Sequence, residues 1–319
     1  MHPTLAETPL PALRSALRNG LSFDFGAARL RLRSDSAELA KQLRAVYANF
    51  PFTDCSDWAD LHVDITRDRG LRRWLGPQVH FISDQQRPFE PFPADMPLPL
   101  LEWGANWLIG KRLNHLLMLH AGALERDGLA LLLPAVPGAG KSTLAAALSL
   151  RGWRLLSDEF GVWDPAAAVF RAMLKPVALK NESIDVIRRF APQSQIGPVF
   201  PKTRKGDVAH LPASADAVAR CCESAAPGAV ILPQWRAGSD TILEPLPTDR
   251  VFPALAYNAF NYTVLGAVGF ESVVQLVRRC PGWRLVYSDL DEALATIDAL
   301  WPEVRRRAAK SAVLAPVGT

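Results

Sequence analysis

The sequence has 319 residues, which is enough for one large domain or two domains of ordinary size. Apolar residues make up 49% of it and the net charge is only +4, which excludes a disordered chain and gives no strong basic footprint of a nucleic-acid-binding protein. No long apolar run predicts a membrane-spanning helix, and the first twenty residues lack the apolar core of a secretion signal. We therefore expect a cytoplasmic protein that binds neither nucleic acid nor membrane.

Cysteine and histidine spacing argues against a structural zinc site. The four cysteines show no two-residue spacing, and no pair of histidines has the spacing of a zinc enzyme. We expect reduced thiols at Cys55, Cys221, Cys222 and Cys280.

Residues 1–97 predict a small N-terminal α+β segment without a chemical motif, which could contact a substrate or an oligomer partner. Residues 23–34 alternate like a strand, and residues 35–50 predict a helix capped by Asp35 or Ser36. Two short strands follow, and then a proline-rich linker and a long helix, at 61–67, 78–84, 87–100 and 101–118.

Residues 98–303 predict a larger α/β domain, and residues 304–319 a basic tail that is typical of a solvated helix end. The domain begins with two strands joined by the hairpin signal Asp127-Gly128, and a helix follows. Further strands are expected at 153–159, 160–164, 228–235, 241–246 and 283–288 and at the beginning of 168–179, and helices at 182–190, 249–260, 269–279 and 289–300.

The stretch "PAVPGAGKSTLAAAL" resembles a phosphate-binding loop of the pattern G-x-x-x-x-G-K-[ST], with Ala135 at the first glycine. A hydrophobic strand precedes it and a helix follows it, as the mechanism requires. Alanine is compatible with the loop if its φ is negative. We expect a nucleotide to be bound by Pro137, Gly138, Ala139, Gly140, Lys141, Ser142 and Thr143. Lys141 would reach the terminal phosphates, and Ser142 would ligate Mg²⁺.

Asp158 and Glu159 follow the helix after the loop by one short strand. Beside a transferring phosphoryl group, one carboxylate can hold Mg²⁺ and the other can accept a proton from the attacking hydroxyl. Asp158 is the expected second metal ligand. From its position on an apolar strand, His120 either faces this site or lies satisfied in the core.

The order of these motifs resembles the HPr kinase/phosphorylase family, in particular its branch of HPr-kinase-related kinase A proteins. The resemblance spans roughly residues 100–300 and includes "GWRLLSDEFG", "KPVALKNESIDVI", the K-G-x-V-A-H-L stretch that begins at Lys205, "NAFNYTVLG" and "YSDLDEA". It implies a P-loop kinase core like those of HPr kinase and phosphoenolpyruvate carboxykinase, with ATP and Mg²⁺ as cofactors.

The resemblance also implies transfer of a phosphoryl group to a serine hydroxyl and an active-site role for His120. Asp158 and Glu159 match the family's pair of aspartates, with the second changed to glutamate. That change leaves open which acid is the base and whether the reverse phosphorolysis occurs. The bifunctional family's downstream signature is not found, so HPr itself is not implied as substrate.

Other candidates remain open at this point. Lys175, Lys180 and Glu182 follow the acids, and the basic loop that contains Lys202, Arg204 and Lys205 could clamp an acidic substrate or simply be solvated. Asn258, Asn261 and Tyr262 could read the substrate or cap helices.

Three functional hypotheses follow. The first is an ATP-dependent kinase, whose acceptor would be a hydroxyl on a protein, a peptide or a small molecule. Such a kinase could be a homo-oligomer. The second hypothesis is an ATP-binding regulatory module without phosphotransfer. The third is a small-molecule kinase or a carboxykinase-like enzyme.

Overall fold

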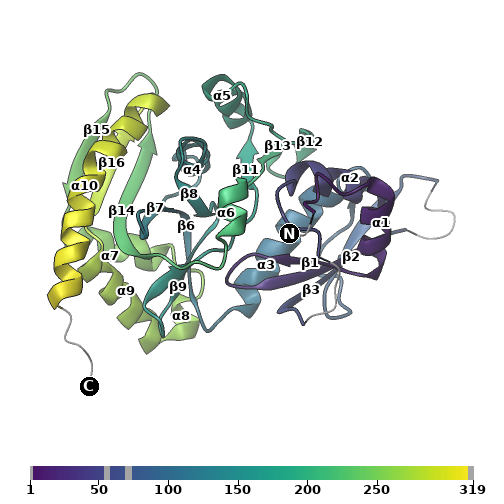
Figure 1. Ribbon diagram of the computed structural model, residues 1–319, viewed down its shortest axis with the longest axis horizontal. Coiled ribbons are helices and arrows are strands. Elements are labelled where there is room, and N and C mark those ends of the chain that lie inside the picture. Colours follow the sequence, from purple (N-terminus) through teal and green to yellow (C-terminus); the bar gives the residue numbers. More distant parts are fainter. Residues whose placement is uncertain (1–2, 54–57, 69–73, 315–319) are drawn as a thin grey trace. The chain divides into compact units, whose positions relative to one another are not determined.

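The computed structural model describes residues 3–53, 58–68 and 74–314 (Figure 1). Helices alternate with several mixed sheets, which agrees with the expected α/β class. The chain packs into two compact units. Unit 1 consists of Met1–Leu113, Leu174–Arg188 and Gln193–Cys221, and unit 2 of Asn114–Met173, Arg189–Pro192 and Cys222–Thr319.

Unit 1 contains two sheets. The five-stranded sheet has the order β1-β2-β3-β4-β5, with β2 and β3 parallel and the other neighbours antiparallel. Its strands are β1 (Leu21–Asp24), β2 (Arg29–Ser34), β3 (Leu61–Arg67), β4 (Gln78–Ile82) and β5 (Phe92–Pro93). The three-stranded antiparallel sheet has the order β11-β13-β12, with β11 (Val177–Lys180), β12 (Phe200–Thr203) and β13 (Gly206–Leu211).

The helices of unit 1 are α1 (Leu10–Asn19), α2 (Ala37–Val46), α3 (Pro97–Arg112), α5 (Glu182–Phe190), whose last two residues belong to unit 2, and α6 (Ala215–Ala219). The predicted cap of α2 is confirmed at Ser36, whose hydroxyl accepts a hydrogen bond from the Leu39 N–H at 3.2 Å. Helix α1 was not predicted.

Several predicted boundaries in unit 1 are wrong for local reasons. Residues 23–34 form two strands, because Gly26 turns the chain at φ 97°. The predicted proline-rich linker contains β5 and the first turn of α3, where Pro97 and Pro99 sacrifice no intrahelical hydrogen bond. The long helix then ends at Arg112 instead of continuing into the next strand.

Unit 2 is built on one eight-stranded sheet with the order β10-β9-β6-β7-β14-β16-β15, and β8 also pairs with β6. The strands are β6 (Leu117–Arg126), β7 (Leu129–Pro134), β8 (Arg154–Ser157), β9 (Phe160–Asp164), β10 (Val169–Arg171), β14 (Ala226–Trp235), β15 (Ile242–Leu246) and β16 (Gly282–Tyr287). The predicted hairpin at Asp127-Gly128 is confirmed, and so is the strand expected at the start of 168–179, which is β10; the end of that stretch forms the separate strand β11.

The middle of this sheet is parallel. Strand β14 runs parallel to β7 on one side and to β16 on the other, so the carboxyl ends of these three strands meet at one edge. In open α/β sheets, ligands bind outside the carboxyl ends of parallel strands. The loop after β7 therefore lies at the edge where a ligand site is expected.

Five helices complete unit 2: α4 (Lys141–Leu150), α7 (Thr248–Tyr257), α8 (Tyr262–Leu265), α9 (Ala267–Arg279) and α10 (Leu290–Leu314). Helices α4 and α10 contact each other, and α10 also packs on β14 and β16 (Figure 1). Most of the predicted basic tail belongs to α10, where Arg305, Arg306, Arg307 and Lys310 are exposed. The end of that tail, 315–319, lies outside the described residues.

The two compact units differ from the expected ranges 1–97 and 98–303. Residues 174–188 and 193–221 were expected in the catalytic domain, but they pack with the N-terminal part of the chain. The separate three-stranded sheet explains the difference, because β11, β12 and β13 pair only with one another and not with the sheet of unit 2. Among the helices that the structure describes, none combines the length and apolar character needed to cross a membrane.

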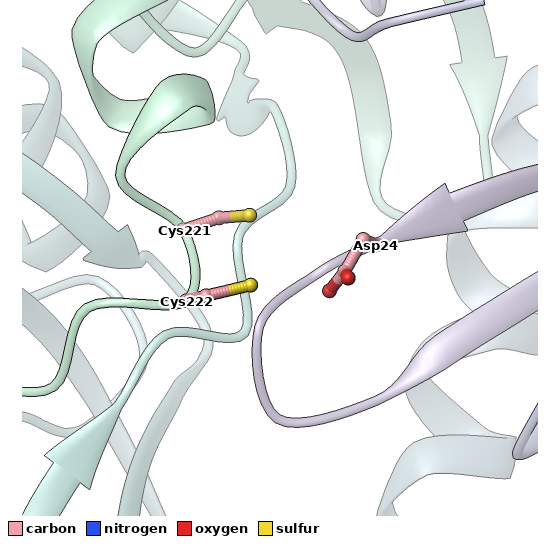
Figure 2. Close-up of side chains that lie close together, drawn as sticks. All are labelled: Asp24, Cys221 and Cys222. Carbon is pink, nitrogen blue, oxygen red and sulfur yellow. The ribbon is translucent and has the colours of Figure 1, made fainter. Parts of the chain in front are cut away.

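Of the cysteines for which reduced thiols are expected, the structure describes Cys221, Cys222 and Cys280. Cys55 lies outside the described residues. Burial raises the pKa of the Cys280 thiol to about 12, which keeps it protonated. Cys221 and Cys222, which are drawn in Figure 2, follow α6. Cys221 is the last residue of unit 1 and Cys222 belongs to unit 2. Asp24, also drawn in Figure 2, accepts hydrogen bonds within its own hairpin from Gly26 N–H and Arg29 Nε.

Candidate functional site

The glycine-rich loop joins β7 to α4 within unit 2. Gly138 and Gly140 have φ values of 88° and 87°, a conformation that favours glycine. Ala135 is buried and has no positive φ, so the first glycine of the usual pattern is not needed for this backbone path. The loop therefore keeps a glycine at both positions where its conformation demands one.

Residues at the ends of the parallel strands also leave no room for a side chain at position 140. A Cβ added there would lie 2.5 Å from the hydroxyl oxygen of Tyr287 and 3.1 Å from Cβ of Trp235. The Tyr287 hydroxyl donates a hydrogen bond to the Gly140 carbonyl at 3.3 Å, and burial raises the pKa of this hydroxyl, so it remains a donor. The Trp235 N–H donates to the Ala139 carbonyl at 3.1 Å.

Strand register brings His120 and the two acids to the start of the loop. Ala121 of β6 pairs with Pro134, the last residue of β7, so His120 stands beside the point where the loop begins. The same strand pairs with β8 through Ala123 and Ser157, and with β9 through His120 and Phe160. The connection between β8 and β9, which consists of Asp158 and Glu159, is thereby held at this edge of the sheet.

His120 is neither fully in the core nor free in solvent. Its side chain is 30% exposed, and Nε2 lies 3.9 Å from a carboxylate oxygen of Glu159, whose side chain is 23% exposed. The imidazole stacks on Phe260 at 5.3 Å between ring centroids. Its backbone N–H donates to the Asn258 carbonyl at 2.6 Å. His120 is therefore half-buried at the edge that holds the loop and the acids, and its active-site role stays a prediction.

The two acids occupy different environments. Asp158 is buried, whereas Glu159 is partly accessible beside His120. The Ser157 hydroxyl oxygen accepts hydrogen bonds from the N–H groups of Glu159 and Phe160, at 3.3 and 3.0 Å, which fixes the turn between the strands. These two bonds hold the backbone that carries Asp158 and Glu159.

The first turn of α4 carries the remaining predicted residues. Lys141 is buried, and Ser142 and Thr143 are half-buried. Four backbone N–H groups at a helix start have no intrahelical partner, and the helix dipole adds partial positive charge there. Together with the loop that contains Pro137, this arrangement can hold phosphate oxygens.

A pocket of ≈ 280 Å³ opens on one side of the loop. Its lining combines one residue of β6, the first half of the loop, and the end of α7 with the segment that follows: His120, Ala135, Val136, Pro137, Tyr257, Asn258, Ala259 and Phe260. Tyr257 is 85% exposed at this pocket and Phe260 is 51% exposed. Neither of these two aromatic residues was predicted as a site residue.

The downstream basic candidates belong to unit 1. Lys175 is buried, and its Nζ pairs with Glu102 at 2.7 Å, so its role is structural. In the loop between β12 and β13, the Arg204 guanidinium lies 5.0 Å from the ring centroid of Trp103. Asn181 precedes α5, and its Oδ1 accepts a hydrogen bond from the Asp207 N–H at 3.0 Å.

The asparagine alternative is decided for structure at Asn261. Its side chain accepts from the Met118 N–H at 3.1 Å and donates to the Leu116 carbonyl at 2.8 Å, so it holds the segment before α8 against β6. Asn258 donates to the Ala254 carbonyl at 2.8 Å, near the end of α7. These contacts fix the backbone on which Phe260 stands.

Trp235 and Tyr287 are the neighbours of the loop that sequence reasoning missed. Trp235 ends β14, which pairs with β7, and Tyr287 ends β16, which pairs with β14. This strand pairing brings both residues close to the loop. Their position at strand ends was the one available signal. No protein-family model matches the chain, and no curated protein matches it.

Proposed function

We propose that the protein is an ATP-dependent kinase that transfers the γ-phosphoryl group to a serine-type hydroxyl. The supporting observation is the register of β6, which sets His120, Asp158 and Glu159 beside the start of a glycine-rich loop. A general base beside a phosphate cradle is what such a transfer requires.

The residues present fit a nucleotide and Mg²⁺. Gly138 leaves open space where a side chain would project, and Gly140 has the conformation that turns backbone N–H groups inward. Lys141 and the first turn of α4 would hold the β- and γ-phosphates, and Ser142 with Asp158 would hold Mg²⁺. The metal ion would neutralise charge that develops on the phosphate oxygens.

Glu159 is the better-placed proton acceptor of the two acids, because it is partly accessible and faces His120. The acceptor oxygen forms a bond to the γ-phosphorus, the bond from that phosphorus to the β–γ bridging oxygen breaks, and ADP leaves. The proton of the acceptor hydroxyl passes to Glu159. His120 orients this carboxylate and adds favourable charge when it is protonated.

Calorimetry of Mg·ATP binding and an ATP-turnover assay test the proposal on the wild type, Lys141→Ala, Asp158→Asn and Glu159→Gln. We expect Lys141→Ala to lose binding, whereas Glu159→Gln should bind ATP normally and lose turnover by a factor of about 10² or more. Asp158→Asn should bind Mg²⁺ more weakly, so that more Mg²⁺ is needed, and should lose turnover. A wild-type protein that binds no Mg·ATP would refute the proposal.

A second function is an ATP-binding interaction module without phosphotransfer. It is favoured by large apolar side chains exposed near the pocket, Tyr257 and Phe260, and by Val264 on α8, which is 68% exposed. Binding of Mg·ATP without turnover, when a lysate of the source cells is added as a supply of acceptors, would favour this module. Turnover that depends on Glu159 would favour the kinase.

A further inference from the structure

Trp235 is a large aromatic side chain exposed beside the glycine-rich loop. It ends β14, whose residues 227–231 are all buried, yet its own exposed fraction is 49%. A single exposed apolar residue is ordinary on a protein surface. What distinguishes Trp235 is how its backbone is attached.

The backbone around Trp235 is anchored on both sides. Its N–H donates to the Ala139 carbonyl of the loop at 3.1 Å, and the next N–H, of Arg236, donates to the Tyr287 carbonyl at 2.9 Å. Its Cβ lies 3.1 Å from the position that a Cβ on Gly140 would occupy. The stem of the indole therefore has a fixed position relative to the loop, which is the preorganisation that a binding surface needs.

The two sides of the loop carry different chemistry. Strand β7 is flanked by β6, which brings His120 and the acids, and by β14, which brings Trp235. A nucleotide whose terminal phosphate faces the acids carries its nucleoside at the far end of the phosphate chain, away from them. On the side of β14, the side chain of Trp235 is exposed, and indole faces stack well on nucleobases.

We propose that Trp235 is the stacking platform for the base of the bound nucleotide, an inference that rests on the proposed nucleotide-dependent function. The ligand class is a nucleoside triphosphate whose base contributes affinity through its π-face. Since every base has such a face, stacking alone selects weakly between purines. Mg·GTP should consequently bind with an affinity within about tenfold of Mg·ATP.

The test compares Mg·ATP with Mg·tripolyphosphate, which has the phosphates but no base. Both ligands are titrated by calorimetry into the wild type, Trp235→Ala and Trp235→Phe. The control is Ile242→Ala, a similarly exposed position on β15 of the same sheet. Base stacking predicts that Trp235→Ala weakens Mg·ATP by about 5- to 100-fold. Tripolyphosphate affinity should be unchanged, Trp235→Phe should retain most of the ATP affinity, and Ile242→Ala should match the wild type.

Three outcomes would overturn the inference in distinguishable ways. Wild-type binding of Mg·ATP with an unchanged Trp235→Ala would refute the platform and leave the proposed function intact. Equal loss of both ligands in Trp235→Ala would show that the residue shapes the loop and does not stack on the base. A wild type that binds neither ligand would refute the proposed function, and the platform with it. Quenching of tryptophan fluorescence by ATP but not by tripolyphosphate, absent in Trp235→Phe, is the expected independent signature.

Discussion

At the scale of single residues, Gly138 and Gly140 share a backbone conformation but not an environment. Their φ values are 88° and 87°. A Cβ at Gly138 would meet nothing within 4 Å, whereas one at Gly140 would lie 2.5 Å from the Tyr287 hydroxyl oxygen. Alanine at either position suffers the same strain of a left-handed backbone, and only at Gly140 does it also collide with a neighbour.

This pair makes a matched test of the loop. Gly138→Ala should lower the free energy of unfolding by about 1–2 kcal/mol, from backbone strain alone. Gly140→Ala should cost about 1–3 kcal/mol more, because the buried tyrosine has to move. Urea denaturation measures both. In a Tyr287→Phe background, the extra cost of Gly140→Ala should shrink, and equal costs for the two alanine variants would contradict the role given to Tyr287.

At the scale of elements, the segment between α7 and α8 acts as a short extension along β6. The Phe260 N–H donates to the Met118 carbonyl at 2.8 Å, and Asn261 bonds to two backbone groups of the chain at Leu116 and Met118. The buried carboxamide of Asn261 thus replaces a partner strand for groups that would otherwise lack one. It also holds Phe260 in its stack with His120.

Asn261→Ala should leave buried backbone groups unsatisfied and lower the free energy of unfolding by about 1–3 kcal/mol. Asn258→Ala is the control, since its side chain donates to the Ala254 carbonyl near a helix end, and we expect a loss below about 1 kcal/mol. Thermal and urea unfolding measure both. Similar costs for the two variants would contradict the bridging role of Asn261.

At the scale of the whole molecule, stability against acid depends on a buried cluster in unit 1. His210 is 1% exposed, and its Nδ1 has no hydrogen-bond partner among the described residues. Burial lowers the pKa of His210 to about 4, with Glu102 raising it and Lys175 and Lys180 lowering it. Burial alone would raise the pKa of Glu102, but the charges of Lys175 and His210 and the hydrogen bonds from Lys175 and Tyr47 outweigh burial and lower it.

The lowered pKa of His210 sets the direction of the pH dependence. Between pH 6.5 and about 4 the unfolded chain binds a proton at this residue and the folded chain does not, so stability falls as the pH falls. The loss should approach about 3 kcal/mol at pH 4. Glu102 adds a loss only below its ordinary value of 4.5. Urea denaturation from pH 7 to 4 measures the slope, and His210→Leu should flatten it above pH 4.5.

The outcome for that variant is decisive because it separates the two groups. A slope that persists unchanged in His210→Leu above pH 4.5 would show that other groups dominate the acid response. A substitution of Glu102 or Lys175 serves as a comparison. Removing one partner of this buried pair should lower the free energy of unfolding at all pH values where the pair is charged.

Patterns that depend on neighbouring residues were predictable from the sequence. The apolar runs around Asp127-Gly128 predict a hairpin, and the glycines and Lys141 predict a turn into a helix. The cap at Ser36 is equally local. The linker predicted from the prolines is partly wrong, because Pro97 and Pro99 lie in the first turn of α3, where proline is compatible with a helix.

The candidate site was predictable only in its first half. The loop and the acid pair share one stretch of chain, so their types and order predicted a phosphate site, whereas the residues alone left His120 open between that site and the core. Lys175 shows the limit of such reasoning, because nothing local reveals that it is buried against Glu102. Lys175 lies just before β11, and its partner Glu102 lies 73 residues earlier in the chain, on α3.

The sequence by itself determined the strand, loop and helix that carry the glycines, and the residue types of the candidate chemistry. Only the tertiary structure decided which distant residues join them. Antiparallel pairing along β6 brings Glu159 to His120, and parallel pairing of β7, β14 and β16 brings Trp235 and Tyr287 to Gly140. The physical reason is that local conformation follows from neighbouring side chains, whereas strand register follows from the packing of the whole sheet, since a slip of one residue would turn every side chain to the other face.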